Sequence, residues 1–78
     1  MNLETDGGGK RYCDIPTLGG EHVRITFVPE DQAGYEVDCV RIQIRDNTGH
    51  LRQGPEVPLL VIGDVYSSII GLLMERRS

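Results

Sequence analysis

Two cysteines and two histidines are the side chains of this 78-residue chain that have the chemistry of a metal site. They are Cys13, His22, Cys39 and His50. Zinc sites usually take their ligands in close pairs such as Cys-x-x-Cys, whereas no two of these residues are near neighbours. The spacing therefore predicts no metal site, and no cofactor-binding pattern stands out elsewhere in the sequence.

A cysteine nucleophile assisted by a histidine is the remaining catalytic possibility. No glycine-rich elbow or helix N-terminus lies beside Cys13 or Cys39 in the sequence to activate either thiol. We therefore expect a protein that is not an enzyme. The alternative is a small enzyme or enzyme subunit that uses Cys39 and His50.

Arginines at alternate positions have the spacing of an anion-binding surface. Apolar and polar residues alternate through Val40–Arg45, so one side of a strand carries Arg41, Gln43 and Arg45. We call this side of the sheet the arginine face. Guanidinium groups suit both phosphates and carboxylates because they present a fork of donors. The residues predicted to bind an anionic partner are Arg24, Arg41, Gln43, Arg45, His50 and Arg52.

Two kinds of anionic partner fit this surface, an acidic protein segment and a single-stranded nucleic acid. The net charge of −4 argues against a general nucleic-acid coat protein. Surfaces for single strands also place aromatic rings between the basic residues, and the predicted arginine face has none. An acidic protein segment is therefore favoured. An ordinary solvated sheet surface is the functionless alternative.

The strands must position these arginines. The side of Val40–Arg45 opposite the arginine face carries Val40, Ile42 and Ile44, and we call it the apolar face. His22–Val28 alternates in the same way, and Arg11–Ile15 is expected to be a shorter strand.

The phase of alternation breaks once within Tyr35–Arg45. Tyr35 and Val37 share one parity, and Val40 and Ile42 share the other. One inserted residue restores the pattern, so a β-bulge is predicted near Asp38 and Cys39.

A turn follows this strand at Asp46–Gly49. A four-residue loop with a left-handed Gly49 would pair Arg45 with His50, which keeps the two polar residues on one face. A three-residue loop would pair Arg45 with Leu51 and mix the faces. We therefore predict the four-residue loop, followed by a short return strand at His50–Gln53.

The C-terminal segment is predicted to be a helix from about residue 64 to 77, with Asp64 as its N-cap. The preceding stretch, Leu59–Ile62, fits either a strand or a helical turn. The helix has more apolar surface than one sheet face can cover, so it is expected to pack on its own sheet and on a second subunit. The predicted dimer interface consists of Val65, Tyr66, Ile69, Ile70 and Leu73.

A chain of this length forms one small domain that usually needs a disulfide, a metal or a partner subunit for stability. The acidic N-terminus has no secretory signal pattern, so a cytoplasmic location with reduced cysteines is expected. The longest apolar run, Leu59–Met74, is short for a membrane span and contains Asp64, so no membrane insertion is expected.

The sequence as a whole predicts an α+β fold. A small antiparallel sheet of three to five strands carries a C-terminal helix packed on one face. Residues 1–10 are expected to form a flexible tail, and residues 11–78 a single domain. The predicted function is a small homodimeric binding or regulatory module that engages an anionic partner. A purely structural interaction protein is a further alternative.

Overall fold

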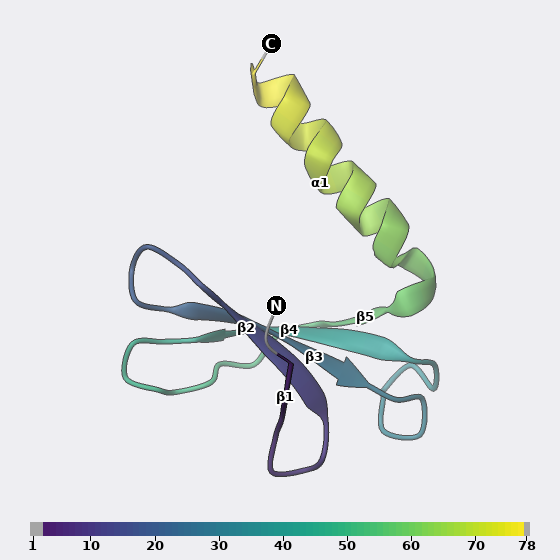
Figure 1. Ribbon diagram of the computed structural model, residues 1–78. Coiled ribbons are helices and arrows are strands. Elements are labelled where there is room, and N and C mark those ends of the chain that lie inside the picture. Colours follow the sequence, from purple (N-terminus) through teal and green to yellow (C-terminus); the bar gives the residue numbers. More distant parts are fainter. Residues whose placement is uncertain (1–2, 78) are drawn as a thin grey trace.

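The computed structural model describes residues 3–77, in which five strands precede one helix (Figure 1). Met1, Asn2 and Ser78, which belong to the predicted tail and domain, lie outside the described residues. The elements are β1 (Glu4–Thr5), β2 (Arg11–Pro16), β3 (His22–Val28), β4 (Cys39–Arg45), β5 (Glu56–Pro58), a 3-10 turn η1 (Leu59–Val61) and α1 (Ile62–Arg77).

The strands form one antiparallel sheet in which every strand pairs with its neighbour in the chain, in the order β1-β2-β3-β4-β5. The α+β class, the antiparallel sheet and the C-terminal helix are therefore confirmed. The observed β3 has the predicted bounds, His22–Val28, and β2 extends the predicted strand by one residue.

The N-terminal segment differs from the flexible tail that was predicted for residues 1–10. Glu4 pairs with Tyr12 and Thr5 with Arg11, so β1 is an edge strand of the sheet. The Asp6 carboxylate fixes the intervening turn because its Oδ1 accepts hydrogen bonds from the backbone N–H groups of Gly8 and Lys10, both at 2.9 Å. A short acidic side chain that bonds to nearby backbone N–H groups is a strong turn signal.

The segment before β4 is a loop and not the first half of a long strand. β4 begins at Cys39, and residues 29–38 fold over one end of the arginine face. Glu36 adopts a left-handed φ of 59° in this loop. The predicted bulge at Asp38 and Cys39 is wrong, because the change of phase in the sequence marks the end of the loop.

This loop covers the small core of the domain. Val28 and Cys39 are fully buried, and Ala33 from the loop is buried against them, with Val37 packed alongside. Val28 pairs with Cys39 in the β3–β4 ladder. The core therefore lies on the same side of the sheet as the arginines, although alternation led us to expect it under the apolar face.

The turn after β4 is the three-residue loop that the sequence argument rejected. Arg45 pairs with Leu51, and Asp46 N–H donates to the His50 carbonyl at 2.9 Å. Asp46 Oδ1 accepts hydrogen bonds from the N–H groups of Thr48 and His50 and from the Thr48 hydroxyl, at 2.6–3.0 Å. Gly49 has the predicted left-handed conformation, with a φ of 89°. Local hydrogen bonding to one carboxylate therefore outweighs the matching of faces at this turn.

The mismatch is corrected a few residues later, at Gly54. Arg52 N–H donates to the Ile44 carbonyl, whereas Ile42 N–H donates to the Pro55 carbonyl. The second bond is one residue out of step with the first, so an extra residue is accommodated on the returning chain, as in a β-bulge. From there, Val57 pairs with Val40 and Glu56 with Arg41, apolar with apolar and acid with base.

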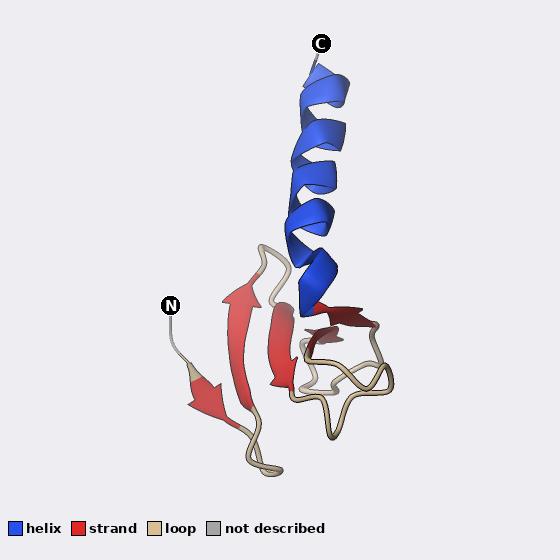
Figure 2. Cartoon of the chain, turned by 90° about the vertical axis from the view of Figure 1, so that its right-hand side faces the viewer, coloured by secondary structure: helices blue, strands red, loops and turns tan. Residues whose placement is uncertain are grey.

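The helix leaves the sheet directly from its edge strand. Pro58 leads into η1, and Ile62 at the end of η1 is already in the right-handed helical conformation (φ −64°, ψ −34°). The ambiguous segment Leu59–Ile62 is therefore helical, and Asp64 lies in the first turn of α1 and is not its N-cap. Only the first turns of α1 approach the apolar face, and its C-terminal end stands away from the strands (Figures 1 and 2).

We predict that Gly54→Ala unfolds or strongly destabilises the sheet. A Cβ at this position would lie 1.7 Å from the Ile42 carbonyl oxygen and 2.8 Å from its carbon, so backbone must move. The loss should exceed about 2 kcal/mol in the free energy of unfolding, measured by urea denaturation.

The matched control is Gly71→Ala, in the middle of α1, where an added Cβ meets nothing within 4 Å. Alanine is favoured over glycine in a helix by up to about 1 kcal/mol, so this variant should be slightly more stable than the parent. A Gly54→Ala protein as stable as the parent would contradict the described register.

Candidate functional site

The sheet brings most of the predicted anion-binding residues together on the arginine face. Arg24 on β3 pairs with Gln43 on β4, and His22 pairs with Arg45. Arg41 lies two residues before Gln43 on the same strand and pairs with Thr26 on β3. Partners in an antiparallel ladder share a face, so these side chains form one continuous surface.

Three carboxylates that were not predicted to be there lie on the same face. Asp14 on β2 pairs with Arg24, and Glu56 on β5 pairs with Arg41. Glu4 on β1 pairs with Tyr12, whose ring Arg24 covers. The position of Asp14 follows from the same alternation, since Cys13 and Ile15 on the apolar side require Asp14 to be on the other. The arginine face is therefore a mixed surface with internal ion pairs.

Asp14 is the principal partner of the arginines. Arg24 donates to it twice, from Nε to Oδ1 at 2.8 Å and from Nη2 to Oδ2 at 3.0 Å. Both side chains are less than a fifth exposed. Arg24 also lies over the Tyr12 ring, 4.0 Å from the ring centre. Hydrogen bonding to Arg24 lowers the pKa of Asp14 below its ordinary value. This bidentate, partly buried ion pair holds both side chains in place at the middle of the face.

Glu56 ties the same surface to the loop over the core. Its Oε2 accepts a hydrogen bond from Arg41 Nη2 at 2.8 Å, and its Oε1 accepts one from the Gly34 N–H at 3.0 Å. The bond to Arg41 and then the bond to Gly34 lower the pKa of Glu56. The Arg41 side chain remains 29% exposed.

Arg45 is the least satisfied of the three strand arginines. Its Nη2 donates to His22 Nδ1 at 3.0 Å, and its Nε lies 3.6 Å from Asp14 Oδ2. That Nε is buried and has no hydrogen-bond acceptor among the described residues. Arg45 therefore has the weakest ion pairing of the three strand arginines on this face.

The structure does not bring His50 and Arg52 to this surface. The three-residue turn pairs Leu51 with Arg45, so Arg52 lies opposite Ile44 on the side of the apolar face. Arg52 is two-thirds exposed and lies 3.5 Å from Asp46. The prediction that His50 and Arg52 lie beside Arg45 depended on the four-residue loop. Because the loop has three residues, this placement is wrong.

The two cysteines are also separated. Cys13 on β2 faces the apolar side, whereas Cys39 on β4 is buried under the loop on the other side, and both are free thiols. The Cys39 thiol donates to the Val37 carbonyl at 3.2 Å, and burial raises its pKa. His50 lies at the far end of β4, so the structure does not assemble the Cys39–His50 pair of the enzyme alternative. Among residues 3–77 no three His, Cys, Asp or Glu side chains gather as a metal site.

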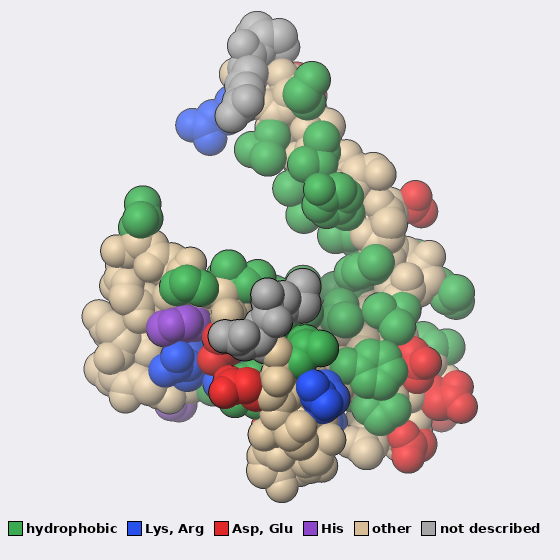
Figure 3. Space-filling model, viewed as in Figure 1, with side chains coloured by type: hydrophobic (Ala, Val, Ile, Leu, Met, Phe, Trp, Pro, Cys, Tyr) green, Lys and Arg blue, Asp and Glu red, His purple; other side chains and the backbone are tan. Residues whose placement is uncertain are grey.

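The apolar face is largely uncovered. Ile15, Phe27 and Ile44 are 36–51% exposed, although they lie in the body of the sheet. Tyr66, Ile69, Ile70 and Leu73 of the predicted dimer interface are 42–68% exposed on α1, and Val65 is half-buried. Hydrophobic side chains run along the helix in the space-filling view (Figure 3).

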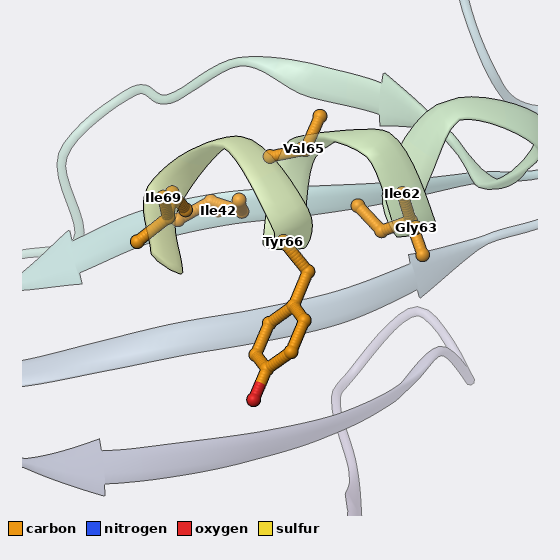
Figure 4. Close-up of a pocket in the computed structure, with 6 residues that line it drawn as sticks. All are labelled: Ile42, Ile62, Gly63, Val65, Tyr66 and Ile69. Carbon is orange, nitrogen blue, oxygen red and sulfur yellow. The ribbon is translucent and has the colours of Figure 1, made fainter. Parts of the chain in front are cut away.

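The helix and the sheet meet in a small apolar hollow. It has a volume of about 450 Å³ and is lined by Ile42 from β4 and by the first two turns of α1. Figure 4 shows Ile42 beside Ile69, with the Tyr66 ring directed out over the neighbouring strands. The contact of α1 with its own sheet is limited to this corner.

No protein-family model, curated protein or solved structure matches this chain. Within the described residues, α1 falls short of the length and hydrophobicity that crossing a membrane requires.

We predict that Asp14→Asn lowers the free energy of unfolding at pH 7 by about 1 kcal/mol, because solvent partly screens the pair. The pKa of Asp14 is lower in the folded state than its ordinary value of 3.8, so the ion pair stabilises the fold fully above that pH. Its contribution is lost as the pH falls through the lowered folded-state pKa. The difference between parent and variant should therefore shrink in acid.

Thermal unfolding at pH 7 and pH 2.5 measures this change. Asp31→Asn is the control, since Asp31 is exposed in the loop before β4, and it should match the parent at both pH values. An Asp14→Asn deficit that is equally large at both pH values would show that packing, and not charge, is responsible.

Proposed function

We propose that this chain is a non-enzymatic binding module that acts as a homodimer and presents the arginine face to an anionic partner. The observation that carries the homodimer is the exposed surface of the single chain. A compact monomer of 8.7 kDa is expected to expose about 4700 Å². This chain exposes 6026 Å².

The excess of about 1300 Å² is more than the ~800 Å² that each partner buries in a standard interface. The radius of gyration, 14.0 Å, likewise exceeds the ~11.5 Å expected for a compact domain of this length. Most of the large exposed hydrophobic residues lie in the sheet or on α1. Contiguous apolar surface of this extent is typical of an interface.

The proposed anion-binding role rests on Arg45. A dimer formed through the apolar face would leave the arginine face outward, and Arg45 has the longest ion-pair contact of the strand arginines there. The Arg45 side chain is 31% exposed, so its guanidinium can donate to a carboxylate of a partner. Among the described strand residues of this surface Tyr12 supplies the aromatic ring, and Arg24 occupies one side of it, which reduces the area for stacking on a base. An acidic protein segment is therefore favoured over a nucleic acid.

The homodimer is tested by sedimentation equilibrium at micromolar concentration. We expect twice the monomer mass for the parent and at least tenfold weaker association for Ile69→Glu, because a buried carboxylate without a partner is costly. Ser68→Glu is the matched control on the polar side of the same helix and should associate normally. A compact monomer over the whole concentration range would contradict the proposal.

The arginine face is tested with an acidic peptide and a single-stranded oligonucleotide as probes. Arg45→Ala should weaken peptide binding about tenfold, equivalent to ~1.4 kcal/mol. Asp14→Asn frees Arg24 and Arg45 from their internal partner and should strengthen binding, although it destabilises the fold. Arg76→Ala at the end of α1 is the control.

Salt dependence separates the two probes. Preferential binding of the oligonucleotide, with a steep linear fall of log affinity against log salt, would identify nucleic acid as the partner. If neither probe responds to Arg45→Ala or Asp14→Asn, the arginine face has only a structural role.

A further inference from the structure

We infer that the dimer forms by reciprocal exchange of helices, with α1 of each copy lying across the apolar face of the other. This inference rests on the homodimer proposed above and specifies which surfaces meet. The occupant of the apolar face is a second copy of this chain, and the contact is between helix and sheet.

In this structure α1 cannot close over its own sheet. Leu59 N–H donates to the Asp38 carbonyl at 2.9 Å, which holds the start of η1 against the end of the loop before β4. From Leu59 to Arg77 the backbone is helical without an intervening loop. There is thus no hinge between β5 and α1, and folding the helix down would require unwinding its first turns.

The uncovered part of the apolar face lies away from the corner where α1 begins. A second apolar hollow, of about 470 Å³, lies over β2, β3 and β4. Apolar residues from three strands line it, among them Cys13, Ile25 and Val40, and Arg11 also contributes to the lining. None of its lining residues belongs to α1, so the helix of the same chain leaves this hollow empty.

The apolar face and α1 also match each other in length. A helix of 16 residues is about 24 Å long, and strands of seven residues are about 23 Å long, so one helix spans the apolar face along β3 or β4. On α1, Tyr66, Ile69, Ile70 and Leu73 follow one another at spacings of three and four residues and form one stripe. The polar residues Asp64, Ser68 and Glu75 lie on the opposite side of the helix.

Symmetry favours the same arrangement. The chain carries both halves of the contact, an apolar sheet face and an apolar helix, and each copy can satisfy the other in one two-fold interface. A contact between the helices alone would leave both apolar faces exposed to water. Reciprocal exchange covers the helix and the sheet of each copy together.

Disulfide trapping tests the arrangement, with the native Cys13 as the sheet-side thiol. One protein is the parent, and the other carries Cys13→Ser together with Leu73→Cys or Ile70→Cys. After mixing and mild oxidation, a heterodimer that depends on both thiols is expected on a non-reducing gel. Buried Cys39 is present in both proteins, so the parent oxidised alone and Cys13→Ser oxidised alone are the background controls.

The alternatives give different products. Helix-to-helix contact would link the Cys13→Ser, Leu73→Cys protein to itself and would overturn the inference. In a single chain with Cys13 and Leu73→Cys, an internal disulfide would show that the helix closes on its own sheet, which also overturns it. Helix exchange instead predicts that the chain with Cys13 and Leu73→Cys forms covalent dimers on oxidation.

Charge complementation provides a second test. Ile25→Lys and Ile69→Glu should each weaken association at least tenfold, and a mixture of the two variants should form dimers again. In the mixed dimer, one helix–sheet contact keeps both native residues, and the other pairs the lysine with the glutamate. Circular dichroism of each variant checks that the fold is retained. A dimer that tolerates Ile25→Lys would overturn helix exchange and leave the homodimer standing, whereas a monomeric parent would overturn both.

Discussion

The backbone of Gly54 lies against the carbonyl of Ile42, and this close approach sets the position of everything that follows it in the chain. The three-residue turn after β4 places Arg52 opposite Ile44, a pairing that would put polar and apolar residues on the same side. One extra residue on the returning chain restores the match, and only glycine fits beside the Ile42 carbonyl at that point. Glu56 then reaches Arg41, and β5 delivers the chain to the start of α1.

Alternation in the sequence predicted which side chains share a face, because the pleat of a strand has a fixed period of two. Val40–Arg45 and His22–Val28 follow that period without interruption, and the helix is recognisable from its length and apolar content. The turn could not be predicted in this way. The sequence argument assumed a regular return strand, whereas the chain accepts a mismatch at Leu51 and corrects it at Gly54.

The composition of the arginine face was predicted only in part. Arg24, Arg41, Gln43 and Arg45 share it as expected, and parity alone would have placed Asp14 among them. That Asp14 lies beside Arg24, and Glu56 beside Arg41, depends on register between strands, which a single sequence does not specify. Alternation also leaves open which element covers which face. The loop of residues 29–38 has no period of its own, so a core of Val28, Ala33 and Cys39 on the arginine side could not be foreseen.

The sheet is a meander in which each strand pairs with the strand made just before it and the one made just after. Closing such short connections costs little chain entropy, and sheets built from local pairings fold faster than those that join distant segments. During synthesis, each strand after β1 emerges when the preceding strand, with which it pairs, has already left the ribosome. The chain can therefore assemble its sheet in the direction in which it is translated, and α1 emerges after all five strands.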